Sequence, residues 1–324
     1  MSQPTSSAPE CANPSVGKIF DVVALGEAMV EFNQIHPGQA QYLRGFGGDT
    51  SNAAIAAARA GARVAYLTRI GQDSFGRALT DLWRAEGVDT RGVQSDGEHP
   101  TGVYFVSHGA AGHEFSYLRA GSAASRMTPQ WLAGEPAAVL QSTRILHVSG
   151  ISLAISPQAC DTAFEAMRMA CEADALVAFD SNLRLKLWPL ARAQACIAHA
   201  VALCDIFMPS LEDMQALTSL SDPGAIVNWG HARGAATVVL KLGADGALVS
   251  NGRRMERIAG VRVTPVDATG AGDCFCGNLL ARLAQGDDVF TAARYANAAA
   301  ALAVQGYGAV APLPYARQVQ VSPG

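Results

Sequence analysis

Residues 266–273 read Val-Asp-Ala-Thr-Gly-Ala-Gly-Asp, and the apolar pattern of a helix follows them directly. Two glycines on either side of an alanine, at the start of a helix, leave main-chain N–H groups free to collect an anion. The carboxylate of Asp273 falls inside the first turn of that helix and can face the same anion. The stretch therefore predicts a place where a phosphate group meets a base, although a purely structural turn before a helix has a similar pattern.

Short, continuous apolar runs alternate along the chain with longer helical patterns. Such runs are typical of strands that are buried on both faces. We expect strands at 19–25, 64–70, 144–148, 176–180, 206–208, 237–242 and 247–250. We expect helices at 52–60, 75–86, 157–172, 189–204, 212–219, 271–285 and 289–305. This alternation predicts a parallel sheet with helices on both faces, and ligands beyond the carboxyl ends of its strands.

Two more polar segments, 31–45 and 101–118, interrupt the alternation. We expect them to form a small separate sheet that covers the site as a lid; the alternative is an edge extension of the main sheet. The α/β domain then spans 19–315. Residues 1–18 are rich in Ser, Pro, Thr and Ala, so a disordered leader is expected there, and residues 316–324 are expected to be a C-terminal tail.

A second glycine-rich stretch reads Phe46-Gly47-Gly48-Asp49, and Asn52 follows it at the start of an expected helix. Two glycines let the backbone approach a ligand closely, and Asp49 and Asn52 offer the acceptors and donors that suit sugar hydroxyls. Capping of the helix by Asp49 or Ser51 would explain the same residues.

Composition excludes several classes of protein. The 324 residues are 49% hydrophobic with a formal net charge of −4, and no basic run suggests a nucleic-acid partner. No stretch is long and apolar enough to span a bilayer, so we expect no membrane partner and a cytoplasmic protein. The seven cysteines lack C-x-x-C spacing, and Cys274 and Cys276 are expected to pack in the core. The P-loop and G-x-G-x-x-G patterns are absent, which disfavours P-loop proteins and dinucleotide oxidoreductases.

Four motifs together resemble the ribokinase-type (PfkB) carbohydrate kinases, over residues 20–312. They are Gly47-Gly48-Asp49-x-x-Asn52, Asp180-x-Asn182-x-Arg184, Lys241-x-Gly243-x-x-Gly246 and Asp267-x-Thr269-Gly270-Ala271-Gly272-Asp273. Residues 117–125 and 180–188 are similar to the 2-dehydro-3-deoxygluconate kinases of that family. The resemblance implies an α/β, ribokinase-like fold, with a mostly parallel central sheet covered by helices on both faces and a small β lid. It also implies ATP-dependent phosphorylation of a sugar acid.

The resemblance also implies roles for individual residues. Asp273 would be the base, and the N–H groups of Gly270, Ala271 and Gly272 would hold the transferring phosphoryl group. The sugar would contact Gly48, Asp49, Asn52, Tyr104, Tyr117, Arg119 and Arg184. ATP would contact Asn182, Arg184, Lys241, Gly243, Gly246 and Asn297. The two arginines could grip a substrate carboxylate, with surface ion pairs as the alternative; the two tyrosines could instead be packing residues.

The resemblance further implies a magnesium ion that accompanies the nucleotide, with Glu212 as an indirect metal residue. Here the family motif Asn-x-x-Glu is altered, because Ser210 stands near Glu212 where an Asn is usual, which puts the local water network in doubt. Asp267 and Thr269 resemble a monovalent-cation loop of some relatives. A homo-oligomer is expected. A fructokinase or other ketose kinase, and a non-catalytic sugar-binding or regulatory protein of the same fold, are the alternatives.

Overall fold

The computed structural model describes residues 17–109 and 112–321. Its main sheet is built from β1 Phe20–Leu25, β4 Val64–Gly71, β5 Val88–Asp89, β6 Val93–Asp96, β9 Thr143–Ser149, β10 Leu176–Asp180, β11 Ile206–Phe207, β12 Thr237–Lys241, β13 Ala247–Ser250 and β14 Met255–Ile258. In this described part of the chain the order is β14-β13-β12-β11-β10-β9-β1-β4-β5, and β6 pairs with β4. All seven expected strands are present, and β5, β6 and β14 are additional short ones.

The main sheet is parallel from β5 to β12, and its last two strands are antiparallel. A parallel crossover needs a dozen or more residues, whereas only a short turn joins β12 to β13. The strand predicted at 247–250 therefore forms, but it runs opposite to its neighbour.

Helices cover both faces of this sheet. On one face lie α1 Asp49–Arg59, α2 Ser74–Ala85, α9 Ala271–Ala284 and α10 Val289–Ala303. On the other lie α3 Glu135–Gln141, α4 Gly150–Ala154, α5 Pro157–Glu172, α6 Leu190–Leu203, α7 Leu211–Thr218 and α8 Pro223–His231. Four short 3-10 helices complete the described elements: η1 Ala123–Arg126, η2 Pro129–Leu132, η3 Gly243–Asp245 and η4 Ala316–Gln318.

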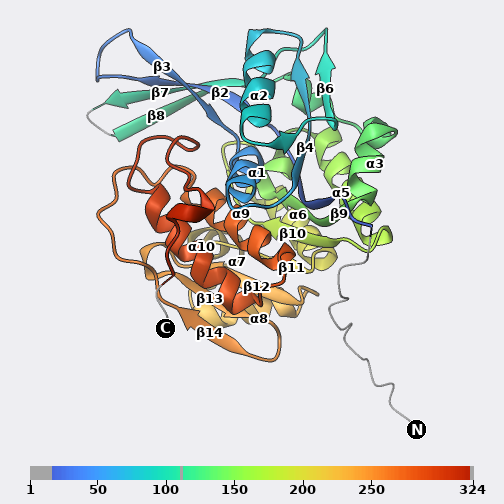
Figure 1. The fold of residues 1–324 in the computed structure, drawn as a ribbon, viewed down its shortest axis with the longest axis vertical. Coiled ribbons are helices and arrows are strands. Elements are labelled where there is room, and N and C mark those ends of the chain that lie inside the picture. The colour runs from blue at the N-terminus through green and yellow to red at the C-terminus, as the bar shows by residue number, and fades with distance from the viewer. Residues whose placement is uncertain (1–16, 110–111, 322–324) are drawn as a thin grey trace.

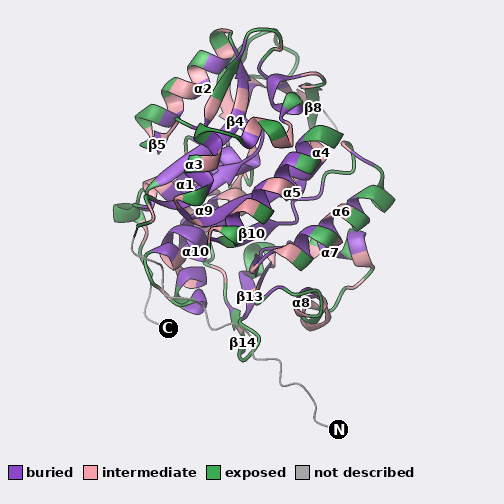
Figure 2. Ribbon diagram, turned by 90° about the vertical axis from the view of Figure 1, so that its right-hand side faces the viewer, coloured by how far each residue is buried: buried purple, intermediate pink, exposed green. Residues whose placement is uncertain are grey.

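The alternation of side chains along β1 divides the hydrophobic core into two. Val22 and Ala24 belong to the cluster under α1, α9 and α10, whereas Val23 and Leu25 belong to the cluster under α5 and α6. Figure 2 shows the resulting layers, with buried strands between helices whose outer faces are exposed. The predicted two-sided burial of the sheet is confirmed.

A second, smaller sheet projects from the main domain (Figure 1). It consists of β2 Met29–Gln34, β3 Tyr42–Gly47, β7 Val103–Gly109 and β8 Gly112–Leu118, in the order β3-β2-β7-β8. Each of the two polar segments is thus a hairpin. The prediction of a separate lid sheet is confirmed, and an edge extension of the main sheet is not what forms.

The expected start of α1 was wrong. The helix begins at Asp49, its cap residue is Gly48, and neither Asp49 nor Ser51 caps it through a side chain. The hydroxyl of Ser51 instead accepts a hydrogen bond from the Trp83 indole at 2.9 Å. The polar residues that resembled a cap are buried helix positions next to the candidate site.

The expected leader and tail fall partly outside the described residues, which exclude 1–16 and 322–324. Lys18 is fixed to the domain, because its ammonium group donates to the carbonyl oxygens of Gln141 and Ala173. Within the expected tail, Ala316–Gln318 forms η4. None of the described helices is long and apolar enough to cross a membrane.

Candidate active site

A cavity of about 730 Å³ lies at the carboxyl ends of the parallel strands, between the main sheet and the lid. Glu27 follows β1, Asp180 ends β10 and Lys241 ends β12, and all three line it. Parallel strands bring their carboxyl ends to one edge of the sheet, which explains why residues so distant in sequence share this wall.

Most of the predicted site residues line this cavity. They are Gly48, Asp49, Asn52, Tyr104, Tyr117, Arg119, Asn182, Arg184, Glu212, Lys241, Gly243, Gly270, Ala271, Gly272 and Asp273. Gly246 and Asn297 do not line it. The Asn297 amide donates to the carbonyl oxygens of Ile258 and Ala259, and Gly246 packs against the same segment. Both residues thus contact the segment that ends β14, which does not line the cavity.

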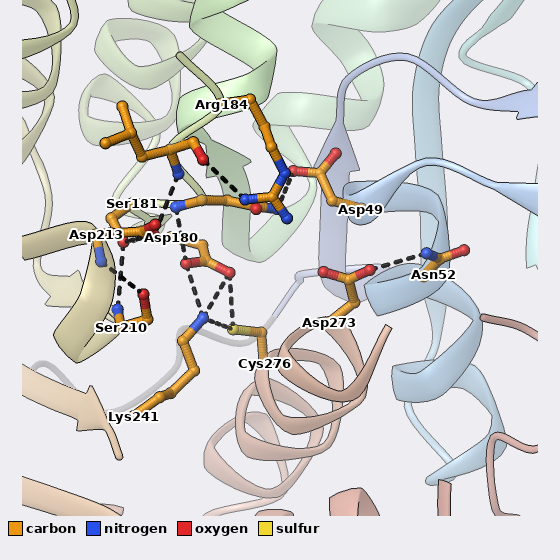
Figure 3. A network of polar contacts seen from close by, with 12 residues as sticks. Asp49, Asn52, Asp180, Ser181, Arg184, Ser210, Asp213, Lys241, Asp273 and Cys276 are labelled. Atoms are coloured by element: carbon orange, nitrogen blue, oxygen red, sulfur yellow. Dashed lines mark hydrogen bonds and ion pairs between the residues drawn. The ribbon is translucent and has the colours of Figure 1, made fainter. Parts of the chain in front are cut away.

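The glycine turn and Asp273 form one end of the cavity. Gly270 has a φ of +75°, and a Cβ atom there would lie 3.1 Å from Ala309, so glycine is needed at this turn. The side chain of Asp273, in the first turn of α9, accepts a hydrogen bond from the Asn52 amide at 2.8 Å (Figure 3). The glycine turn and the Asp273 carboxylate thus line the same end of the cavity, where the Ala271 N–H donates to the carbonyl oxygen of Ala268 at 3.2 Å, and the predicted anion site there stays a prediction.

The surroundings of Asp273 raise its pKa to about 7, even though the side chain touches the cavity. Loss of hydration is the main cause, and the nearby negative charge of Asp49 adds to it. The hydrogen bond from Asn52 acts in the opposite direction, because it favours the ionised carboxylate. A carboxyl group with this pKa can take up a proton near neutral pH.

Lys241 forms an ion pair on the floor of the cavity. Its ammonium group donates to both carboxylate oxygens of Asp180 at 2.8 Å, and the Cys276 thiol donates to Asp180 at 3.3 Å (Figure 3). Burial alone would lower the pKa of Lys241, but the charge of Asp180 outweighs it and raises the pKa. A Cβ atom at Gly272 would lie 3.6 Å from the Lys241 ammonium nitrogen. A fixed positive charge therefore lies beside the first turn of α9.

Asn182 connects the nucleotide residues to the sugar residues predicted from the sequence. Its amide donates to Asp49 at 2.8 Å, and its φ of +24° is unusual for a residue with a side chain. The second oxygen of Asp49 and the amide oxygen of Asn52 are buried, and neither accepts a hydrogen bond from the described residues. Buried acceptors of this kind usually find a donor, which a ligand hydroxyl can supply.

The two predicted arginines lie in different surroundings. Arg119 forms an ion pair with the carboxylate of Glu27, and the two side chains are 11% and 0% exposed. Arg184 is exposed, donates to the carbonyl oxygen of Leu183 at 2.8 Å, and forms no ion pair with a described carboxylate. The alternative role for both arginines was a surface ion pair. Arg184 forms no such pair with the described residues, and the ion pair of Arg119 is buried.

Both tyrosines come from the lid. The rings of Tyr104 and Tyr117 stack with centroids 5.6 Å apart. Tyr104 is buried and donates its hydroxyl hydrogen to Glu31, and burial followed by the charge of Glu31 raises its pKa. Tyr117 is 41% exposed. Tyr104 is therefore partly a packing residue, whereas Tyr117, whose ring also stacks with Phe115, is a more exposed residue of the cavity lining.

The altered Asn-x-x-Glu motif begins α7. Ser210 is the N-cap residue, and its hydroxyl accepts a hydrogen bond from the N–H of Asp213 at 3.1 Å. Glu212 is exposed at the cavity wall. Asp213 accepts hydrogen bonds from the Ser181 hydroxyl and the Leu183 N–H, which fixes the loop after β10 (Figure 3). Serine thus serves as the helix cap here, since its side chain satisfies the free N–H group.

Within the described residues, no group of three or more His, Cys, Asp or Glu side chains is arranged so that it could hold a metal ion. The loop with Asp267 and Thr269 is closed by its own hydrogen bonds. The Asp267 carboxylate accepts from the Thr269 N–H and hydroxyl, and from the N–H of Gly308 at 2.9 Å.

Sequence reasoning missed three features of the site. It did not name Glu27, it gave Asp180 no role of its own, and it did not predict the contact between Cys276 and Asp180. Glu27 and Asp180 each end or follow a buried strand, so their position at the carboxyl edge of the sheet was a usable signal. The expectation that Cys276 only packs was incomplete, because its thiol contacts the Asp180 and Lys241 pair.

Comparisons with known proteins agree with this geometry. The family described as pfkB family carbohydrate kinase matches residues 15–316. A 2-dehydro-3-deoxygluconokinase of Thermoproteus tenax is 35% identical over 93% of this chain and 94% of its own length. A fructokinase of Vibrio alginolyticus is 33% identical over 89% and 94%. The structure of a fructokinase with bound ATP from Xylella fastidiosa superposes with a TM-score of 0.84, at 26% identity, over 93% of this chain and 97% of that one. The chain therefore belongs to the pfkB family of carbohydrate kinases.

Proposed function

We propose that this carbohydrate kinase transfers the γ-phosphoryl group of ATP to a sugar acid, and that 2-dehydro-3-deoxygluconate is its substrate and the 6-phosphate its product. The observation that carries the proposal is the meeting of Asp273, the N terminus of α9 and the exposed Arg184 guanidinium in one cavity. A base and an anion site suit phosphoryl transfer, and a guanidinium group without a carboxylate partner suits an acidic sugar. The name of the Thermoproteus tenax relative supports the same substrate.

Asp273 is proposed to accept the proton of the attacking sugar hydroxyl. The phosphoryl transition state is loose, so position and charge stabilisation matter more than the strength of the base. The N–H groups of Gly270, Ala271 and Gly272 would stabilise the charge on the transferring group, and the Lys241 ammonium beside them would add a full positive charge. Asn52, which donates to Asp273, would hold the carboxylate in place.

The sugar is proposed to contact Gly48, Asp49, Asn52, Tyr104, Tyr117, Arg119 and Arg184, which share the cavity. Asp49 and Asn52 each have a buried oxygen without a described donor, and two neighbouring sugar hydroxyls would satisfy both. The paired state of Arg119 makes Arg184 the better receptor for the substrate carboxylate.

ATP is proposed as the phosphoryl donor. The anion site at α9 and the cation of Lys241 fit its terminal phosphates. Asn182, Arg184, Lys241 and Gly243 line the cavity, while Gly246 and Asn297 would support its nucleotide wall from behind. Magnesium would supply charge neutralisation on the phosphates and be held largely by them and by water, with Glu212 near it through water. A monovalent cation near Asp267 and Thr269, a homo-oligomeric state and a cytoplasmic location remain part of the proposal.

A ketose such as fructose is the second candidate substrate. The buried ion pair of Arg119 with Glu27 favours it, because that arginine needs no substrate carboxylate to balance its charge. The name of the Vibrio alginolyticus relative also supports it.

The test is ADP release measured with ATP and Mg²⁺ across a panel of 2-keto-3-deoxy sugar acids and neutral ketoses. We expect kcat/KM for 2-dehydro-3-deoxygluconate to exceed that for fructose by at least about 100-fold, the effect of about 3 kcal/mol from a lost charge-assisted contact. The reverse order would assign the protein to the ketose kinases.

A further inference from the structure

The lid is joined to the main domain around a single buried carboxylate, that of Glu27. Its two hairpins give the described chain four crossings between lid and main domain: from β1 to β2, from β3 to α1, into β7, and out of β8. Glu27 lies in the first crossing, between β1 and β2.

The other three crossings pack against Glu27. Gly48, between β3 and α1, has a φ of +115°, and a Cβ atom there would lie 2.5 Å from the carbonyl oxygen of Glu27. Gly102, before β7, would place a Cβ atom 2.8 Å from its carboxylate oxygen. Beyond β8, Arg119 forms the ion pair, and the Ser122 hydroxyl donates to the same carboxylate at 2.5 Å. Three of the four crossings therefore meet at the Glu27 side chain, whereas Gly48 packs against its main-chain carbonyl group.

The charge of Glu27 matters because its side chain is fully buried. A buried carboxylate is costly unless hydrogen bonds and an opposite charge compensate it. Here Arg119 supplies the charge and Ser122 a hydrogen bond, so Arg119 is held in one position in the cavity. Glu27 itself lines the cavity, but its oxygens face these partners.

We infer that Glu27 is a positioning residue of the sugar site, whose carboxylate fixes Arg119 in the cavity and joins three of the four crossings between the lid and the main domain. The inference rests on the proposed function, because sugar is what the lid and Arg119 would hold. It assigns Glu27 no contact with the reacting atoms.

The test compares Glu27→Gln, which keeps the shape and removes the charge, with Asp21→Asn as a matched control. Asp21 lies near the start of β1, the strand that Glu27 follows, and pairs with Arg63 at 2.8 Å. Glu27→Gln is expected to raise the sugar KM about 10- to 100-fold, because one charge-assisted interaction is lost. The KM for ATP should change less than about threefold. The control should change neither KM by more than about twofold.

Hydrogen exchange in the free protein gives a readout that needs no substrate. Glu27→Gln should speed amide exchange in β2, β7 and β8 at least about tenfold, and Asp21→Asn should leave those strands unchanged. If no sugar on the panel is phosphorylated by the parent protein, the proposed function fails, while exchange still tests Glu27.

Unchanged exchange in the lid, or a sugar KM within about threefold of the parent, would overturn the inference. If Glu27→Gln does not fold, Ser122→Ala keeps the Glu27 carboxylate and removes its hydrogen bond from Ser122, together with the cap bond from the Ser125 N–H. That variant should raise the sugar KM about 3- to 10-fold. An unchanged sugar KM in Ser122→Ala would overturn the inference in the same way.

Discussion

Replacing Asp273 with Asn is expected to abolish most of the turnover and, above pH 7, to make the folded protein more stable. Removal of one positioned base typically costs about 10²–10⁴ in rate. Asparagine has nearly the same shape and can still accept the hydrogen bond from Asn52. The KM for ATP should therefore stay within about threefold, while kcat falls.

The stability gain follows from the raised pKa of Asp273, which is about 7, because an unfolded carboxyl group titrates near about 3.9. Between these two values the folded protein keeps a proton that the unfolded chain has released, so the free energy of unfolding falls as the pH rises. A difference of about 3 pH units corresponds to at most about 4 kcal/mol. An asparagine at this position has no charge to bury and escapes this loss.

Thermal unfolding between pH 5 and pH 8 measures this effect. With an unfolding entropy of about 2 cal/mol/K per residue, Asp273→Asn should raise Tm by up to about 6 °C at pH 8 and about 2 °C at pH 5. Asp21→Asn is a control of opposite sign. Burial opposes ionisation of Asp21, but its bonds to Arg63 outweigh that and lower its pKa, so this variant should lose stability above about pH 4.

Two results would refute the reasoning. Turnover of Asp273→Asn within about threefold of the parent at pH 8 would remove Asp273 from the role of base. A Tm at pH 8 no higher than that of the parent, with the control behaving as expected, would show that the cavity does not oppose the charge of Asp273.

Three other outcomes are expected. The pH midpoint of kcat/KM, near about 7 in the parent protein, should fall in Asp49→Asn, because a negative charge next to Asp273 is lost. The midpoint should rise in Asn52→Ala, because a hydrogen bond to the Asp273 carboxylate is lost. Shifts of both variants in the same direction would contradict this account. Arg184→Ala should raise the KM for a sugar acid about 10- to 100-fold more than the KM for a neutral ketose, whereas Arg119→Ala should raise both alike. The KM for ATP is measured in parallel. An equal rise of KM for both sugars in Arg184→Ala would favour the ketose kinases. Saturating sugar and nucleotide should slow hydrogen exchange in β2, β7 and β8 more than in α9, and unchanged exchange would mean that the lid does not close.

The sequence predicted the layers of the fold well because the buried strands are continuous apolar runs. The elements it missed are short, such as β5 and β14, and the start of α1 was placed too late because the helix begins with polar residues at Asp49. The direction of β13 depends on the length of one turn, which an apolar pattern does not reveal. Tertiary packing decides where these elements begin and in which direction β13 runs. A hydrophobic period of two or 3.6 residues in the sequence carries no information about that packing.

The members of the site were predictable from the resemblance, but their partners were not. Asn182 and Asp49 are 133 positions apart, and Lys241 and Asp180 are 61 apart. Neither pair follows from spacing within a helix or strand. Asp180 also shows why composition is a weak guide to electrostatics, since the same carboxylate type is an ion-pair partner there and has a raised pKa, about 7, at Asp273.

The charges around the cavity give a reason for a divalent ion to enter with the nucleotide. The carboxylates that line it are Glu27, Asp49, Asp180, Glu212, Asp213 and Asp273, and the cations are Arg119, Arg184, Lys186 and Lys241. Six carboxylates against four cations leave the wall acidic or, with Asp273 protonated, nearly balanced. Two of the cations, Arg119 and Lys241, are already committed to buried carboxylates. The triphosphate and sugar acid proposed as ligands would bring several more negative charges into this space, and Arg184 and Lys186, which pair with no described carboxylate, would not balance them. A divalent ion that accompanied the proposed ATP would supply the missing positive charge, so the acidity of the wall is a physical reason to expect that magnesium binds with the nucleotide.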